Sequence, residues 1–155
     1  MRSGNRSLVA RWRLRWLLWT GRTQQAIDWL TEHLQRQPED THALASLGYL
    51  LAQADRLDEA ADALERLVRF DPVNAHGWFN LGFVREQQGQ DLDAMNAVER
   101  AVRVDDRHDR AWFGLGQTLA RMERHADAIA AFSRNTALQP MSPHGWQALA
   151  LAQLA

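Results

Sequence analysis

Cysteine and lysine are both missing from the 155 residues of this chain. Without cysteine the protein has no disulfide bond, no thiol nucleophile and no thiolate metal ligand. Only 4 prolines and 9 glycines occur, which is too few for a long flexible linker. The remaining composition is that of an ordinary soluble domain, since 46% of the residues are hydrophobic and 24% are charged. We therefore expect a single folded domain.

A strong net charge is also lacking. The 18 basic residues are all arginines, and together with 19 acidic residues they give a formal net charge of -1. A domain that binds nucleic acid through its overall charge is normally strongly basic, so a nucleic-acid partner is not expected. The exclusive use of arginine, together with many alanines, is typical of a bacterial gene rich in GC.

No uninterrupted apolar run approaches the roughly 20 residues that span a membrane. The apolar segment 8–19 is broken by three arginines and leaves no signal-peptide core, so we expect a cytoplasmic protein. The start of the chain, from Met1 to Arg22, holds six arginines and no acid. Two interpretations stay open: a first helix with an arginine-rich polar face, or an interfacial helix that places Trp12, Trp16 and Trp19 at lipid headgroups.

What the sequence does contain is an internal repeat, in which positions i and i+34 carry the same residue types. Five residue types recur with this spacing. The aligned positions are Trp78, Trp112 and Trp146; Leu47, Leu81, Leu115 and Leu149; Gly48, Gly82 and Gly116; Ala26, Ala60, Ala94 and Ala128; and Pro38, Pro72 and Pro140, with Asp106 at the remaining proline place. Because one spacing is shared by five residue types, the chain is predicted to consist of repeated structural units.

Each unit has the pattern of two helices. In residues 75–108, Trp78, Leu81 and Gly82 fall on one helical face. Gly89 then interrupts the pattern, and a second apolar stripe of helical period follows it. The unit is therefore predicted to be a helix, a turn and a second helix.

Small and capping residues indicate how these helices start and meet. Gly82 and Ala94 lack large side chains, which predicts that the two helices of a unit approach closely. Asn74, Asp109 and Ser142 are expected to stand just before the first helices and to be their N-caps.

These motifs resemble the tetratricopeptide repeat (TPR) family, whose unit of about 34 residues carries Trp, Leu-Gly, Tyr, Ala, Phe and Pro at fixed places. The best match is the unit 109–142. It contains Trp112, Leu115, Gly116, Leu119, Ala128, Phe132 and Pro140. The resemblance implies an all-α protein: an α-solenoid of antiparallel helix pairs wound into a right-handed superhelix, with the first helices lining its concave side.

The predicted domain organisation follows the repeat. Residues 1–6 are expected to be a disordered N-terminus, and residues 7–155 a single TPR domain. Its units are 7–40, which is degenerate in its first helix, 41–74, 75–108, 109–142 and a capping helix at 143–155.

The resemblance also implies that a partner binds in the concave groove, at fixed places on the first helices. In this chain those places hold aromatic and polar side chains. The predicted groove residues are Tyr49, His76, Phe79, Asn80, Phe83, Arg110, Phe113 and Gln117. Aromatic residues beside an arginine are typical of binding hot spots. For Phe79 and Phe113, packing between neighbouring helices remains an equal alternative.

Other kinds of site find little support. The carboxylate clamp of some TPR domains needs five suitable side chains, and only Asn80 and Arg110 fit. His42, His76 and His144 share one repeat place, but successive repeats lie roughly 10 Å apart. Ligands of one zinc ion must each lie about 2 Å from it. No set of nucleophile, base and orienting residue is recognisable, so we predict no enzyme activity, no metal and no cofactor.

The predicted function is a non-enzymatic protein–protein interaction module or scaffold that holds a protein or peptide segment, as a small bacterial adaptor or a secretion-type chaperone would. The alternative is a membrane-peripheral assembly scaffold anchored by residues 8–19. A further expectation concerns residues 143–155, which contain no Asp, Glu, Lys or Arg. Leu151 and Leu154 are not used by the repeat, which leaves two explanations open: a homo-oligomer formed through the C-terminal helix covers them, or a continuation of the native chain does.

Overall fold

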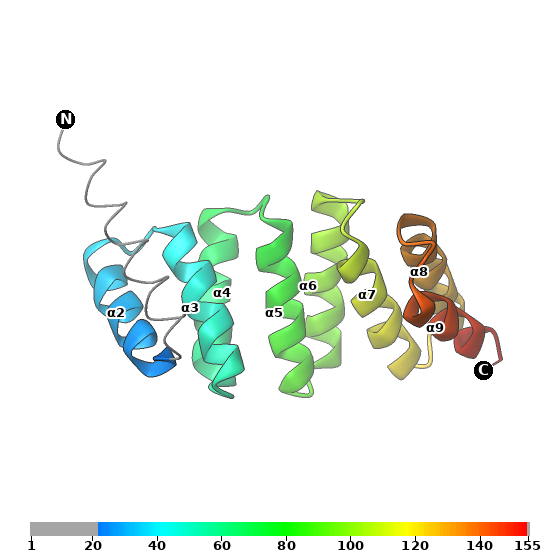
Figure 1. The fold of residues 1–155 in the computed structure, drawn as a ribbon, viewed down its shortest axis with the longest axis horizontal. Coiled ribbons are helices and arrows are strands. Elements are labelled where there is room, and N and C mark those ends of the chain that lie inside the picture. Colours follow the sequence, from blue (N-terminus) through cyan, green and yellow to red (C-terminus); the bar gives the residue numbers. More distant parts are fainter. Residues whose placement is uncertain (1–21, 155) are drawn as a thin grey trace.

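The computed structural model describes residues 22–154, and within this range it holds eight α-helices and no β-strand (Figure 1). The helices are α2 (Thr23–Arg36), α3 (Thr41–Gln53), α4 (Leu57–Phe70), α5 (Ala75–Gln87), α6 (Asp91–Val104), α7 (Asp109–Arg121), α8 (His125–Leu138) and α9 (Pro143–Leu154). Helices α3 and α4, α5 and α6, and α7 and α8 form pairs that stack along the molecule. The predicted all-α solenoid is therefore the observed architecture.

The stacking produces two layers. In the view of Figure 1, the first helices α3, α5, α7 and α9 lie toward the reader, and α4, α6 and α8 lie behind them. Helices α3, α5 and α7 each pack on their own partner and on the next first helix, and α5, α7 and α9 also pack on the second helix before them. Three of the predicted features lie outside the described residues: the disordered start at 1–6, the first helix of the degenerate unit, and the basic segment 8–19.

The helices form because their apolar residues share one face. In α4, Ala60, Leu64 and Leu67 are spaced by three or four residues and are all fully buried. Acidic residues in its first turn, such as Asp58, and Arg69 in its last turn complement the helix dipole. None of the helices in residues 22–154 is long and apolar enough to cross a membrane.

Side chains that stand one repeat period apart cap the first helices. The carboxylate of Asp40 accepts a hydrogen bond from the Ala43 N–H at 3.0 Å, and the Asn74 side-chain oxygen accepts one from the Gly77 N–H at 2.8 Å. These bonds satisfy amides that have no partner inside the helix. The prediction that Asn74 caps its helix is confirmed.

The predicted cap of α7 is wrong by one residue. The cap is His108, whose Nδ1 accepts from the Ala111 N–H at 3.2 Å. Asp109 is the first residue of α7 itself. It therefore belongs to the first helical turn, whose free N–H groups the preceding capping residue has to bond.

The turn inside each helix pair needs a left-handed backbone at one residue. Asp55, Gly89 and Glu123 occupy the same place in successive units and have φ angles of 59°, 73° and 60°. Glycine adopts this conformation without strain, whereas a residue with a Cβ atom does so at a cost. The interruption predicted at Gly89 is therefore a left-handed turn that recurs in each unit, and the units with Asp55 and Glu123 form it without glycine.

Glycine in the first helices lets the paired helix approach closely. A Cβ atom at Gly82 would lie 2.4 Å from Val98 Cγ2 and 3.1 Å from the carbonyl oxygen of Ala94. At Gly48 and Gly116, the same place in other units, a Cβ atom would lie 2.6 Å from a side chain of the paired helix. The predicted close approach is confirmed.

The core consists of two adjoining clusters, one mainly from α2 to α5 and the other mainly from α6 to α9. Trp78 packs against both clusters. Its indole N–H donates to the carbonyl oxygen of Pro72 at 2.9 Å, and Trp112 and Trp146 make the equivalent bond six residues back. The tryptophan ladder thus ties each first helix to the loop before it.

Candidate functional site

A groove with a volume of about 910 Å³ runs along α3, α5 and α7 and reaches the start of α9. Seven of the eight predicted groove residues line it, namely Tyr49, Phe79, Asn80, Phe83, Arg110, Phe113 and Gln117. They come together because the repeat places equivalent residues on the same face of successive first helices. His76 is the exception, since it is not among the lining residues.

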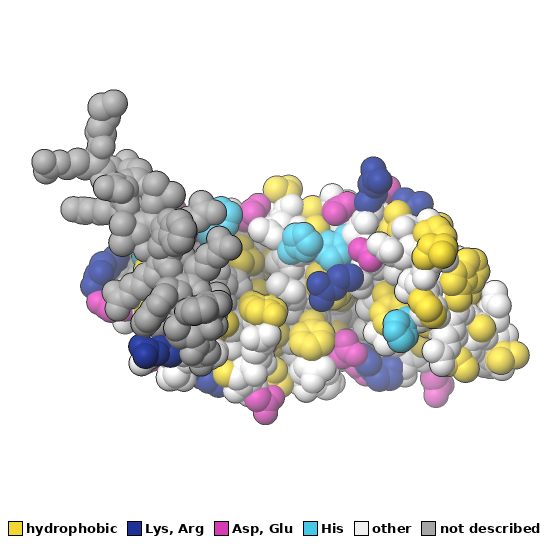
Figure 2. Space-filling view, in the orientation of Figure 1, with side chains coloured by type: hydrophobic (Ala, Val, Ile, Leu, Met, Phe, Trp, Pro, Cys, Tyr) yellow, Lys and Arg dark blue, Asp and Glu magenta, His cyan; other side chains and the backbone are white. Residues whose placement is uncertain are grey.

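Four aromatic side chains, which we call the aromatic strip, dominate the groove: Tyr49, Phe79, Phe83 and Phe113. Tyr49 is 53% exposed and Phe83 is 48% exposed. Phe79 and Phe113 are partly buried, because they line the groove with one edge and pack against the core with the other. Both alternatives considered for these two residues therefore hold at once. Figure 2 shows hydrophobic side chains gathered beside histidine and arginine side chains in the middle of this face.

Polar side chains border the aromatic strip. The guanidinium carbon of Arg110 lies 5.3 Å from the centroid of the Phe79 ring, which is a cation–π contact. Arg110 lines the groove, and within the described part of the chain it makes no ion pair. Asn80 and Gln117 add amide groups that both donate and accept hydrogen bonds.

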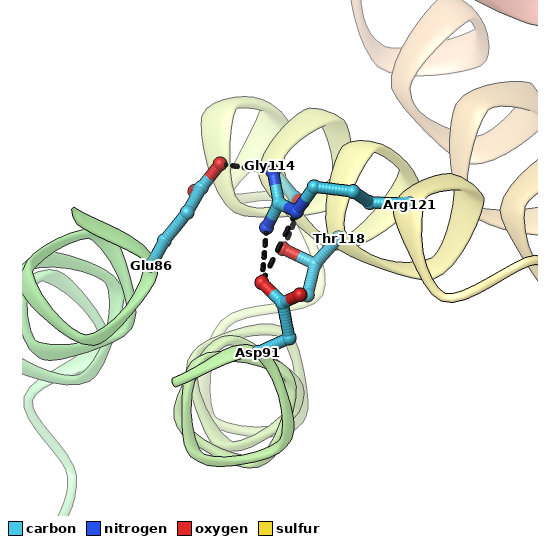
Figure 3. Close-up of polar contacts among 5 residues, drawn as sticks. All are labelled: Glu86, Asp91, Gly114, Thr118 and Arg121. Atoms are coloured by element: carbon cyan, nitrogen blue, oxygen red, sulfur yellow. Dashed lines mark hydrogen bonds and ion pairs between the residues drawn. The ribbon is translucent and has the colours of Figure 1, made fainter. Parts of the chain in front are cut away.

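The carboxylate of Glu86 also lines the groove, and Arg121 neutralises it (Figure 3). Arg121 Nη1 donates to Glu86 at 2.6 Å, while its Nη2 and Nε donate to Asp91 at 2.9 and 3.1 Å. The hydrogen bond to Glu86, followed by the one to Asp91, raises the pKa of Arg121. Beside it, the Thr118 hydroxyl donates to the carbonyl oxygen of Gly114 at 3.1 Å. One arginine thus joins α5, α6 and α7 at one end of the groove.

The contact of His108 with His76 was not predicted from the sequence. The His108 side chain is only 6% exposed, its Nε2 lies 2.9 Å from Nδ1 of His76, and its ring centroid lies 5.2 Å from that of Phe79. Burial, and after it the charge of His76, lowers the pKa of His108. Its place one repeat period after Asn74 is the signal that identifies it as a cap.

Asn135 of α8 lines the groove, although it was not among the predicted groove residues. Its side-chain N–H donates to the carbonyl oxygen of Asp109 at 2.9 Å, whereas its Oδ1 is buried without a hydrogen-bond partner in the described structure. A Cβ atom at Gly145 would lie 2.5 Å from that oxygen, so glycine is required there. The prediction considered first helices only, and Asn135 reaches the groove from a second helix.

Two models of sequence families match the chain, over residues 17–78 and 79–143, and each is described as tetratricopeptide repeat. The chain belongs to the tetratricopeptide repeat family. Together the two matches include both helices of the three pairs α3–α4, α5–α6 and α7–α8, which are the TPR units that build the groove.

Solved structures show the same TPR solenoid. A crystal structure of MamA protein covers 97% of this chain and 82% of its own, with a TM-score of 0.90 and 21% identity. A MamA structure from Desulfovibrio magneticus RS-1 that starts at residue 41 covers 94% and 82%, with a TM-score of 0.85 and 20% identity. YrrB, described as a TPR protein with an unusual peptide-binding site, covers 91% and 73%, with a TM-score of 0.80 and 20% identity. At these identities the likeness shows the fold alone. No curated protein sequence matches the chain.

The C-terminal TPR helix, α9, presents an apolar outer face. Leu151 is 61% exposed and Leu154 is 85% exposed, and Trp146 is about half exposed. Figure 2 shows hydrophobic side chains gathered at this end of the molecule. Leu149 and Ala152 of the same helix are buried against α7 and α8.

Proposed function

We propose that this protein is a non-enzymatic interaction module that binds a segment of a partner protein in the groove along α3, α5 and α7. The observation that carries the proposal is the exposure of Tyr49 and Phe83 on the groove wall, 53% and 48% respectively. Large aromatic rings that are half exposed in a concave surface stabilise a complex when a ligand covers them, because apolar surface is then removed from water. The description of YrrB as a peptide-binding TPR protein supports the same class of function.

The residues divide into two roles. The aromatic strip provides apolar contacts for side chains of the ligand, in the manner of a binding hot spot. Arg110, Asn80 and Gln117 are placed to bond the ligand backbone or an acidic side chain, because they carry donors and acceptors at the border of the strip. Affinity for one short segment would be micromolar, about -8 kcal/mol. This profile fits a small cytoplasmic bacterial adaptor or a secretion-type chaperone.

The test is a binding measurement with a peptide selected against the full chain from a random peptide library. Phe83→Ala should weaken binding of that peptide about 5- to 150-fold, since truncating a central aromatic anchor costs about 1–3 kcal/mol. The matched control is Leu92→Ala on α6, which truncates a side chain that is 60% exposed and does not line the groove.

Leu92→Ala should leave the affinity unchanged, and both variants should keep the wild-type circular dichroism spectrum. Equal effects of the two variants, or unchanged affinity of folded Phe83→Ala, would contradict binding in the groove.

The sequence also favours a second candidate, a membrane-peripheral scaffold, because residues 8–19 combine arginines with three tryptophans. Co-sedimentation with vesicles of phosphatidylcholine and phosphatidylglycerol separates the two. Binding that is lost on removal of residues 1–20 and persists in Phe83→Ala supports the membrane role. Absence of binding by the full chain removes it.

A further inference from the structure

Two histidine rings from neighbouring units meet at the border of the groove. His108, before α7, accepts the Ala111 N–H on its Nδ1 at 3.2 Å. Its Nε2 lies 2.9 Å from Nδ1 of His76 on α5, and the two rings meet edge to face with centroids 4.6 Å apart. Asn74, the equivalent cap of α5, makes no such contact with the equivalent histidine of α3. The histidine contact is therefore a special feature of the α5–α7 junction in the described chain.

The two hydrogen bonds fix where the protons are. Since Nδ1 of His108 accepts from an amide, its proton must be on Nε2, which donates to Nδ1 of His76. His76 then carries its own proton on Nε2, and both rings are neutral. When the pair takes up a third proton, three of the four ring nitrogens carry a proton and one does not. If the nitrogen without a proton is Nδ1 of His108, N–H groups of the two rings face each other and their hydrogen bond is lost. If it is any other nitrogen, Nδ1 of His108 carries a proton and can no longer accept the Ala111 N–H, so the helix cap is lost. Every protonated form thus breaks at least one of the two bonds.

Groups from each neighbouring element act on the pair. His76 and the apolar Phe79 face His108 from α5, Asp105 faces it from the turn after α6, and Asp109 from α7. Burial and then His76 lower the pKa of His108, and the two aspartates oppose them without reversing the direction. The unfolded chain takes up this proton near pH 6.5, whereas the folded chain resists it until a lower pH. The contribution of His108 to stability is therefore complete above about pH 6.5 and is lost as the pH falls below it.

The pair also contacts Phe79, a residue that lines the groove. The His108 ring is 5.2 Å from the Phe79 ring, and Arg110 covers Phe79 with its guanidinium carbon 5.3 Å from the centroid. We propose that the His76–His108 contact, together with the cap that His108 makes on α7, is a proton-sensitive latch that holds α5 and α7 together at neutral pH and releases the border of the groove on acidification. The effect on ligand binding rests on the proposed function, but the latch itself is a property of the ligand-free protein.

Two measurements on the full chain without ligand test the latch. Nitrogen-15 NMR of the histidine rings at pH 7.5 should show His108 protonated only on Nε2 and His76 only on Nε2. On acidification, His108 should titrate at lower pH than in the same chain unfolded in urea. Because this titration uses the wild type, it does not depend on whether any variant folds.

The second measurement is a distance. Val73 and Arg107 are exposed, stand one repeat period apart and directly precede the caps Asn74 and His108. Because the chain has no cysteine, Val73→Cys with Arg107→Cys places two spin labels only at these sites. Between pH 7.5 and 5.5 the label distance should lengthen and its distribution should broaden.

The same labels in His108→Asn should show a pH-independent distance, because asparagine caps α5 at the equivalent position and does not titrate. His144→Gln, an exposed histidine at the repeat place of His76, is the control that should behave like the wild type. A proton on Nδ1 of His108 at pH 7.5, a wild-type distance that does not change with pH, or a change that persists in His108→Asn would overturn the proposal. None of these outcomes depends on a ligand, so failure of the latch and failure of the proposed function are distinguishable.

Discussion

At the scale of single residues, the same task is done in successive units by different side chains. An aspartate, an asparagine and a histidine cap α3, α5 and α7, and all three accept the amide three residues on. Burial alone would raise the pKa of Asp40, but hydrogen bonds from His33 and the Ala43 N–H outweigh it, and the pKa is lowered. The repeat therefore preserves the geometry of the cap but not its residue type. The capping side chain can then be acidic, neutral or titratable in different units.

The close approach at Gly82 predicts that alanine affects the free energy of unfolding differently at Gly82 and at Gly114. Gly82→Ala should lower the free energy of unfolding by about 1–3 kcal/mol, because the added methyl meets stiff, buried Val98 at 2.4 Å and the backbone of Ala94 at 3.1 Å. Gly114→Ala should be neutral or stabilising by up to about 1 kcal/mol, because alanine favours the helix. Its methyl would lie 3.4 Å from Phe79, which is ordinary contact.

Urea unfolding of both variants, followed by circular dichroism, checks this pair. Equal stabilities for the two variants would show that the helices can separate at Gly82 without cost.

Some residue-scale features were predictable and others were not. The tryptophan, leucine and glycine ladders follow from the spacing, because packing of identical units demands identical sizes at identical places. The left-handed turns at Asp55 and Glu123 do not, since only glycine signals a positive φ. Asp109 was preferred to His108 as the cap of α7 for a similar reason, because histidine is not among the preferred capping residues.

At the scale of helices, the period of apolar residues predicts the helix pairs well, because each helix must bury one face. What it does not predict is what covers the outer face of α9. In α9, Leu149 and Ala152 are buried, whereas Leu151 and Leu154 remain exposed with no charged residue among them.

We expect a second copy of the chain to cover this face of α9. The helix has no Asp, Glu or Arg, so two identical faces can meet about a two-fold axis without desolvating a charge. Sedimentation velocity over a range of micromolar concentrations should show a monomer–dimer equilibrium. The double variant Leu151→Glu with Leu154→Glu should abolish the dimer, and Leu92→Glu on α6, also an exposed leucine, should not. A wild type that stays monomeric at all concentrations would contradict the expectation.

At the scale of the whole molecule, the two core clusters meet at Trp78. Trp78→Ala should cost about 3 kcal/mol and should split one unfolding transition into two, because the clusters then share less buried surface. Urea unfolding together with hydrogen exchange would show the two halves losing protection separately.

Trp146→Ala is the matched control for Trp78→Ala, since it removes the same side chain and an equivalent hydrogen bond at the end of the solenoid. It should cost less and leave a single transition. Identical, single transitions for the two variants would mean that the clusters are joined by other contacts.

The solenoid itself follows from the sequence, because units that repeat can only bury their apolar faces on one another. The lining of the groove follows only in part. Tyr49 and Phe83 lie at places that the repeat directs outward, so their positions were predictable. Arg121 pairs with acids of the preceding unit, and Asn135 enters from a second helix. Such contacts depend on the relative placement of units, which a pattern along one chain does not contain.

Contacts between the described helices join only neighbours, or next neighbours, along the chain. Native contacts therefore form with little loss of loop-closure entropy. Helical proteins with mainly local contacts fold in microseconds to milliseconds. During synthesis, each pair can fold on the previous one as soon as it leaves the ribosome. The groove, however, needs α3, α5 and α7 together. A nascent chain would therefore be mostly folded well before it gains the surface that we propose for binding.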